Sequence, residues 1–464
     1  MERLPTLPEE RFFSSYSSFF YTLASLASAV WIVLVGGALP AVGDTRIGVL
    51  GYACGTVLGA VLVLLSIALP AFRYGVDSVV LGRAALGVRG SGVVVVGIVV
   101  SALGWAGIAL AMVARGIGQL AAQLGYTAVE ETLVTGVALA LIPLVLVLVR
   151  HGLPAIRRLN DFAGPGFILL AVVSLGLLAK RYGVSGLFSV NVPPEQALTH
   201  DRLKSFAYGF EFGMTISVAW WPYMGGLYRY LRHRRHAVGP LLFGGSLVGN
   251  VFSAAVAAVA TVHLGTPDPV VWWLTLAGPA VGSIIVCGIL LLSVPAICLM
   301  VYFVASALRQ SASLSRLSWE WLVGLSCVPL VFVALDTGWT LNHVVTVANL
   351  GGLVFFSVCG ICLADYWLLR AGQLNLRALY VAGESGAYWY HGGVNWVATL
   401  VMAGGTACYV WLFNPVTMAA PDAFRYAGAA PPVVAGSGLA YWLLMLLVGR
   451  FSRARHYAAY PRGS

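Results

Sequence analysis

One acidic side chain, Glu211, lies deep inside an apolar stretch of this sequence, SFAYGFEFGMTISVAWWPY at 205–223. In a helix rising 1.5 Å per residue from Lys204, Glu211 is about 10 Å below a membrane surface. An ionised carboxylate there costs several kcal/mol unless it is paired or faces water, so such residues usually belong to a proton relay or a solute pathway. Two structural roles stay open: accepting freed backbone N–H groups, or pairing with Lys204 or another outer cation.

Cysteine and histidine offer no comparable site. The seven cysteines lie in apolar stretches and the Cys359-x-x-Cys362 pair stands alone, so we expect packing thiols and neither disulfides nor a metal cluster. The eight histidines form no metal-ligand pair on one helix, and the sequence has neither a GxxxxGK[ST] phosphate loop nor a repeated filter motif. These absences argue against a membrane-embedded enzyme, an ATP-driven pump and a channel, and no cofactor is expected.

The composition indicates what holds Glu211 in place. A mean hydropathy of +0.88, with 59% hydrophobic and 9% charged residues, excludes a soluble globule. The apolar stretches are about 20 residues long, which is the length of a membrane-spanning helix and twice that of a barrel strand. The first stretch is too long for the core of a signal peptide, so we expect no cleaved signal. The sequence therefore predicts an all-α integral membrane protein in the lipid bilayer.

Twelve spans are predicted, followed by a basic tail. They cover residues 18–40, 47–70, 92–114, 128–149, 161–179, 205–227, 238–262, 281–306, 319–335, 341–364, 393–413 and 432–449.

Charge fixes the expected orientation. With both termini in the cytoplasm, 20 of the 27 Lys and Arg residues face inward and 7 face outward, as the positive-inside rule requires. This topology explains the net charge of +10, so we expect no nucleic acid partner. The basic loop RYLRHRRH at 229–236 is predicted to meet anionic lipid. We expect a plasma (inner) membrane protein that is a monomer or a weak homodimer.

The first ten spans divide into two blocks of five. Five spans begin and end on opposite sides of the membrane, so the second block enters from the side opposite to the first. If the two blocks share a fold, they are inverted copies, an arrangement typical of transporters. We assign 1–17 to a cytoplasmic segment, 18–180 to the first repeat, 181–364 to the second, and 365–464 to a linker, two extra helices and the tail.

Each repeat is expected to begin with a broken helix. Span 1 carries Ser25 and Ser28 in FFYTLASLASAVW, and span 6 carries Gly209, Gly213 and Pro222, which favour a break close to Glu211. The glycines of GYACGTVLG in span 2 are instead interpreted as close packing between helices.

Two long stretches resemble one family in sequence. RYGVDSVVLGRAALGVRGS at 73–91 is similar to the loop after span 2 of the nucleobase:cation symporter-1 family, which includes cytosine, uracil, allantoin and hydantoin permeases. GICLADYWLLRAGQLNLRALY at 360–380 and GAYWYHGGVNWVATL at 386–400 resemble the segment between its spans 10 and 11, and GWAGIALAMVA at 104–114 resembles span 3. The resemblance implies a LeuT-like 5+5 inverted repeat with two further C-terminal helices.

The same resemblance implies a stacking site. Trp105 matches a span 3 tryptophan that stacks on a flat substrate, while Ala109 stands where hydantoin-type members have glutamine. A second ring expected near Ser217 is absent, so Phe210 or Phe212 is proposed instead. The predicted substrate-binding residues are Ser28, Trp105, Ala109, Phe210, Glu211, Phe212, Gly213 and Ser217.

The cation site departs from the family. Pro295 and Ala296 occupy the place of the span 8 hydroxyls that bind sodium, and the asparagine expected near Val301 is absent. The remaining oxygens predicted to bind a cation belong to Ser25, Ser28 and Ser293, together with span 1 carbonyls. Glu211 is predicted to take up a proton instead, so H+ is favoured over Na+.

These features together predict a secondary transporter and no enzyme. It would import a small planar heterocycle, such as a nucleobase, hydantoin or allantoin-like compound, coupled to a cation by alternating access. The alternative is a degenerate member that acts as a sensor or carries a different small organic solute. Saturable uptake into proteoliposomes separates transport from sensing.

Overall fold

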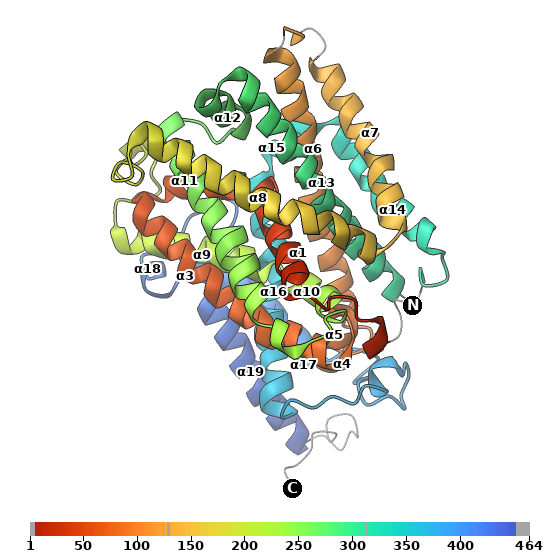
Figure 1. The fold of residues 1–464 in the computed structure, drawn as a ribbon. Helices are drawn as coiled ribbons and strands as arrows, with labels where there is room; N and C mark the ends of the chain where they lie inside the picture. Colours follow the sequence, from red (N-terminus) through yellow and green to blue (C-terminus); the bar gives the residue numbers. More distant parts are fainter. Residues whose placement is uncertain (1–4, 124, 128–129, 312, 452–464) are drawn as a thin grey trace.

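Helices form nearly all of the regular structure (Figure 1). The structure is a computed structural model that describes residues 5–123, 125–127, 130–311 and 313–451, and this part of the chain contains only two isolated β-bridges and no strand. The helices that build the predicted spans are α1 (Tyr16–Ser28), α2 (Trp31–Ala38), α3 (Thr45–Val63), α4 (Leu69–Tyr74), α6 (Gly92–Gln123), α7 (Glu130–Arg150), α8 (Leu153–Tyr182), α9 (Arg202–Val218), α10 (Trp221–Tyr228), α11 (Ser253–Leu264), α13 (Pro279–Gln310), α14 (Trp319–Leu335), α16 (Val344–Leu363), α17 (Trp396–Leu412) and α19 (Ala430–Phe451).

Shorter helices connect them. These are α5 (Ser78–Leu86), α12 (Pro269–Ala277), α15 (Thr337–Asn342) and α18 (Phe424–Ala427), with π-helical segments η3 (Leu64–Ala68), η7 (Pro240–Phe252) and η8 (Ala364–Leu369) and 3₁₀ turns at Pro8–Glu10, Leu39–Val42, Pro194–Gln196, Arg234–His236 and Ala378–Tyr380.

Every one of the twelve predicted spans overlaps a helix or a pair of consecutive helices. By length and hydropathy, eight helices in the described residues can cross a membrane, or nine if the bent pair α1 and α2 counts as one span. Helices α14 and α17 are apolar but shorter, and the pair α9 and α10 does not meet the criterion. The multi-pass membrane architecture is therefore clear, whereas the count of twelve stays a prediction.

Spans 1 and 6 are both interrupted. Helices α1 and α2 meet at an angle of 58° because Ala29 adopts an extended backbone that ends α1. Helix α9 ends at Val218, and α10 begins at Trp221 with Pro222 in its first turn, where a proline's missing N–H is tolerated. The break in span 6 was thus expected too early, since Glu211 and Gly213 lie inside an unbroken helix.

Glycines bring α3 and α9 into backbone contact. A Cβ on Gly51 or Gly55 would collide with the carbonyl oxygens of Phe206 or Phe210, and one on Gly213 would collide with the carbonyl oxygen of Tyr52. The packing interpretation of the span 2 glycines is confirmed. Gly213 serves the same interface from the opposite helix, so its role in the described structure is packing and it does not mark the break.

Gly55→Ala is expected to destabilise the protein by about 1–3 kcal/mol, the usual range for overpacking a tight interface. The added methyl group would force α3 and α9 apart at the Phe210 carbonyl. Thermal unfolding in detergent measures the effect. Gly176→Ala on α8 is the matched control, because a Cβ there meets no atom within 4 Å; equal midpoints for the two variants would contradict the prediction.

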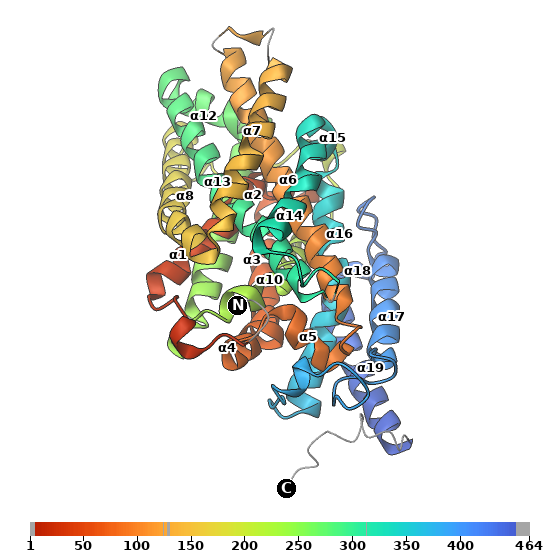
Figure 2. The same ribbon diagram turned by 90° about the vertical axis from the view of Figure 1, so that its right-hand side faces the viewer.

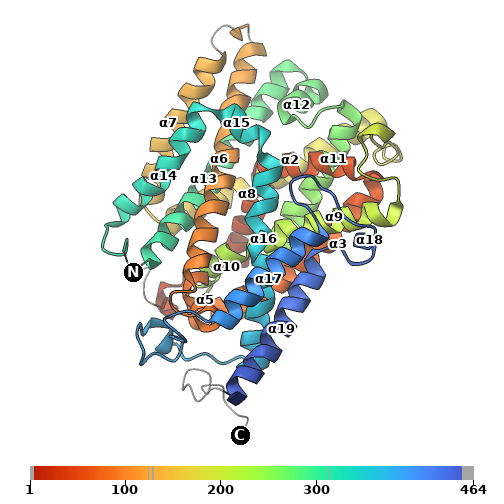
Figure 3. The ribbon, with the colours of Figure 1, turned by 180° about the vertical axis from the view of Figure 1, so that it is seen from behind.

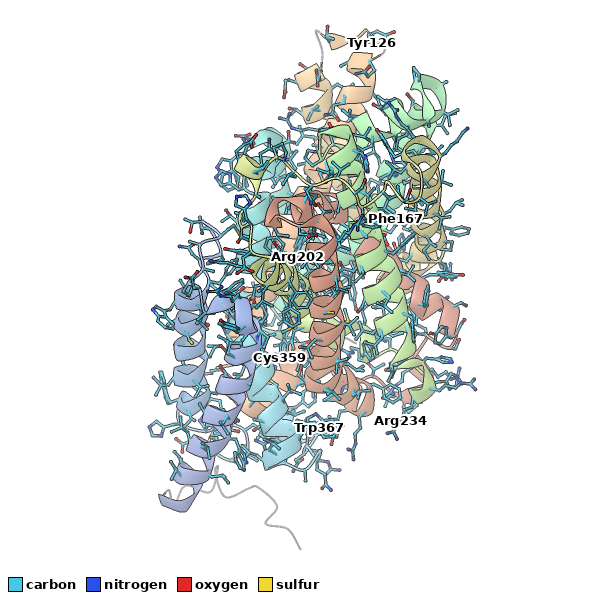
Figure 4. The ribbon with its side chains drawn as sticks, turned by 90° about the vertical axis from the view of Figure 1, so that its left-hand side faces the viewer. Tyr126, Phe167, Arg202, Arg234, Cys359 and Trp367 are labelled. Atoms are coloured by element: carbon cyan, nitrogen blue, oxygen red, sulfur yellow. The ribbon has the colours of Figure 1, made fainter. Side chains whose placement is uncertain are left out.

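The last two long helices form a separate edge of the bundle. Helices α17 and α19 pack against each other and against α16, away from α7 and α8 (Figures 2 and 3). Tyr126, beside the turn between α6 and α7, and Trp367, beyond α16, mark opposite ends of the molecule (Figure 4). We call these the α6–α7 end and the C-terminal end.

Candidate functional site

A cavity lies where the breaks of spans 1 and 6 meet α6, η7 and α13. Its residues surround about 360 Å³ of non-atom space, part of it open to solvent, and they are Ala27, Trp31, Ile32, Val35, Trp105, Ile216, Trp220, Tyr223, Asn250 and Met300. We call it the central cavity. None of these lining residues is charged at neutral pH, and four are aromatic. Such a lining suits a flat and neutral solute, because aromatic faces provide contact area without requiring a charge.

Three tryptophans shape the central cavity. Trp31 begins α2 directly after the first break, and its ring lies 5.7 Å from that of Trp105 at an angle of 60°. Trp220 enters from the second break, between α9 and α10. The indoles of Trp31 and Trp220 therefore line the same space from the two interrupted spans.

The other predicted aromatic residues lie elsewhere. The Phe210 ring stacks on Phe206 at 6.1 Å, and neither Phe210 nor Phe212 is among the residues that line the central cavity. Ala109 is completely buried one helical turn from Trp105 and does not line it either. The aromatic side chains of the cavity that the sequence interpretation missed are Trp31, Trp220 and Tyr223.

A signal for Trp220 is present in the sequence. Pro222 favours the first turn of a new helix, so the dipeptide before it, Trp220-Trp221, falls at a helix start. Placing the break by that proline, and not by Gly213, would have brought Trp220 to the site.

A second and smaller cavity adjoins the central one. It encloses about 290 Å³ and is lined by Ala60, Val63, Ser217, Trp220, Leu241, Gly245, Ser246 and Asn250. Trp220 and Asn250 line both cavities, and we call the second one the side cavity. Ser217, predicted as a substrate-binding residue, lies here and donates a hydrogen bond to the Thr56 carbonyl at 2.8 Å.

Glu211 points away from both cavities. Its buried carboxylate accepts hydrogen bonds from the backbone N–H groups of Ala429 at 2.8 Å and Ala430 at 3.1 Å, where α19 begins. The first N–H groups of a helix lack helical partners and carry partial positive charge, so they hold the carboxylate. This is the capping role that the sequence left open. The expected position beside the break is wrong, and Lys204 pairs with Asp422 instead, at 3.5 Å.

Two serines predicted to bind a cation, Ser25 and Ser28, lie in the last turn of α1. Helix α1 stops at Ser28, and the last carbonyls of a helix have no helical partner. The Ser25 hydroxyl is buried and has no hydrogen-bond partner in the described structure. Ser28 donates to the Gly249 carbonyl, and Ser293 donates to Ile289 of its own helix. The described residues contain no cluster of three or more His, Cys, Asp or Glu that fits a metal ion.

The two ends of the molecule differ around the central cavity. Toward the α6–α7 end lies a larger cavity of about 700 Å³, lined among others by Val30, Arg115, Gln119 and Asp268. Toward the C-terminal end, Asp77 accepts hydrogen bonds from Arg229 at 3.3 Å and Gln310 at 2.7 Å. Through Asp77, these bonds link the end of span 6 to the end of span 8.

Two broken helices around a central cavity, within a bundle of apolar helices, define the class of membrane transporters with discontinuous spans. Residues 6–444 match the model of a family described as permease for cytosine/purines, uracil, thiamine, allantoin. The chain therefore belongs to this permease family. This confirms the family inferred from the loop motifs and the choice of a transporter over an enzyme.

Solved structures agree on the fold. Mhp1, a nucleobase-cation-symport-1 family transporter in a closed conformation with bromovinylhydantoin bound, matches with 19% identity, a TM-score of 0.75 and coverage of 100% of this chain and 97% of its own. Its inward-facing conformation matches with 18% identity, the same TM-score and the same coverages. A Na+-coupled sialic acid symporter matches with 10% identity, a TM-score of 0.59 and coverages of 97% and 92%. No curated protein sequence matches. The predicted LeuT-like fold is confirmed.

Proposed function

We propose that this protein imports a neutral planar heterocycle, of the size of a nucleobase, hydantoin or allantoin, by cation-coupled alternating access. The observation that carries the proposal is the central cavity, in which Trp105 and Trp220 enter from different helices and no lining side chain is charged. The family description and the hydantoin bound to Mhp1 support this class of substrate.

The coupling ion is proposed to be Na+, bound by the oxygens at the end of α1. The sequence favoured H+ because Glu211 was expected to face the cavity. Its carboxylate instead accepts hydrogen bonds from the backbone N–H groups of Ala429 and Ala430. The buried and unpartnered hydroxyl of Ser25 and the free carbonyls of α1 are the kind of hard ligands that Na+ prefers. The Na+-coupled sialic acid symporter of similar fold supports the same choice.

We assign the α6–α7 end to the outside, with both termini in the cytoplasm of a plasma (inner) membrane. The excess of Lys and Arg in the loops of the opposite end supports this orientation. The 700 Å³ cavity then opens outward, and the bonds of Asp77 close the cytoplasmic side. Transport requires these bonds to break while spans 1, 2, 6 and 7 rock against spans 3, 4, 8 and 9. A monomer or weak homodimer is proposed.

Uptake into proteoliposomes tests the proposal. The purified full chain is reconstituted, and radiolabelled uracil, cytosine, hydantoin and allantoin are offered under an inward Na+ gradient, an inward H+ gradient, or neither. We expect saturable uptake of at least one compound that the Na+ gradient accelerates. Acceleration by H+ alone would overturn the assignment of the ion. Binding without uptake would instead support the sensor that the sequence left open, and no binding would overturn the substrate class.

A further inference from the structure

Asn250 is buried between the two cavities, and only the oxygen of its side-chain amide has a hydrogen-bond partner in the described structure. Its side chain is only 4% exposed and lines both the central and the side cavity. The Oδ1 atom accepts a hydrogen bond from the hydroxyl of Tyr52. In the described part of the chain, no acceptor receives the two hydrogens of its Nδ2 atom. Because Asn250 lines both cavities, these hydrogens are open to a ligand that enters them.

Ser246 presents a second free polar atom in the same place. It is also 4% exposed and lines the side cavity, and its hydroxyl makes no hydrogen bond to the described residues. Asn250 and Ser246 both belong to η7, a π-helical segment of 13 residues. Wider turns of this kind are uncommon and frequently occur at functional sites.

Trp220 places these polar groups beside a stacking surface. Its indole lines the central cavity together with Trp105 and lines the side cavity together with Ser246, while Asn250 borders both spaces. A flat ring stacked on Trp220 therefore has its edge within the space that Asn250 borders. Across the central cavity, α13 contributes only Met300, which cannot donate a hydrogen bond. The Tyr223 hydroxyl, which also lines this cavity, already donates to Ser101. The Asn250 amide of η7 is therefore an available donor for the edge of the ring.

We propose that Asn250 is a specificity-determining residue for the transported heterocycle. Its Nδ2 donates a hydrogen bond to a ring carbonyl oxygen or an unprotonated ring nitrogen, while the Ser246 hydroxyl bonds the neighbouring position of the ring. Tyr52 fixes the amide by donating to Oδ1, so that the donor side faces the substrate. The inference rests on the proposed function and narrows it to neutral heterocycles with an acceptor on the ring edge.

Equilibrium binding to the detergent-purified full chain tests this assignment. The probes are uracil and hydantoin and their thione analogues, in which sulfur replaces a carbonyl oxygen and accepts hydrogen bonds weakly. The variants are Asn250→Ala and Ser246→Ala. Asn160→Ala is the matched control, because Asn160 is a buried asparagine on α8 that donates to the Ile156 carbonyl and lines neither cavity. Unfolding midpoints establish that each variant is folded.

Asn250→Ala is expected to weaken binding of the carbonyl compound about 10- to 100-fold. It should also remove most of the preference for carbonyl over thione, because the alanine substitution and the replacement of oxygen by sulfur delete the same hydrogen bond. Ser246→Ala removes only a hydroxyl that makes no hydrogen bond to the described residues, and it is expected to weaken binding about 3- to 10-fold. Asn160→Ala should leave binding unchanged. If both η7 variants bind the probes like the wild type, or keep its full preference for carbonyl over thione compounds, the role of Asn250 is overturned while the proposed function stands. If the wild type binds none of the probes, the proposed function fails and takes this inference with it.

Discussion

Replacing Trp105 with alanine is expected to weaken substrate binding about 10- to 100-fold. Stacking of a flat ring on an aromatic side chain contributes roughly 1–3 kcal/mol, and each 1.4 kcal/mol is a factor of ten. Trp220→Ala should have a similar effect, because its indole lines the same cavity from the break between α9 and α10. Trp105→Phe should restore part of the affinity, since it keeps a smaller aromatic face.

Equilibrium binding of radiolabelled heterocycles to the purified protein measures this loss. Trp321→Ala is the control, because Trp321 lies on α14 with 72% of its surface exposed and touches no part of the site. Phe210→Ala distinguishes the structure from the earlier interpretation of the sequence. Affinity that survives loss of Trp105 and Trp220 but not loss of Phe210 would move the stacking site out of the central cavity.

Replacing Glu211 with alanine is expected to lower the free energy of unfolding by about 3 kcal/mol. The change removes two hydrogen bonds to a buried carboxylate and leaves the N–H groups of Ala429 and Ala430 without acceptors. Glu211→Gln keeps one acceptor oxygen, so its free energy of unfolding should fall by less. Because the carboxylate faces α19 and not the cavity, Glu211→Gln should transport with an unchanged dependence on pH.

Thermal unfolding in detergent, together with uptake measured between pH 5 and 8, separates the two roles. Glu131→Ala is the matched control, since Glu131 is an exposed carboxylate on α7 paired with Arg115 at 3.7 Å, and exposed pairs contribute about 0–1 kcal/mol. A Glu211→Gln protein with normal stability and an altered dependence of uptake on pH would contradict this assignment and show that Glu211 takes part in coupling.

Hydropathy, loop charge and the loop motifs were sufficient to predict the fold class and the family. These features are local, because a span needs only about 20 apolar residues and a loop motif is contiguous. The close packing of Gly51 and Gly55 was also predictable, since small residues spaced along a membrane helix usually mark a helix interface.

The site depends on contacts between distant residues, and there the sequence interpretation was weaker. The partners of Glu211 lie 218 and 219 residues later in the chain, and no local pattern links them. Trp220 was missed because the glycines of span 6 were assigned to a break, whereas they meet α3. Asn250 was overlooked because no local pattern shows which cavity a single asparagine in an apolar span faces, and only the structure shows that it borders both cavities.

The contact between α3 and α9 limits which parts of the protein can move. Where Gly51, Gly55 and Gly213 bring the two backbones together, no side chain lies between them to change rotamer and accommodate sliding. Independent sliding of α3 and α9 is therefore blocked, and the two helices are expected to move as one unit. If spans 1, 2, 6 and 7 move together as proposed, the angular change of alternating access falls at the contacts of this unit with spans 3, 4, 8 and 9.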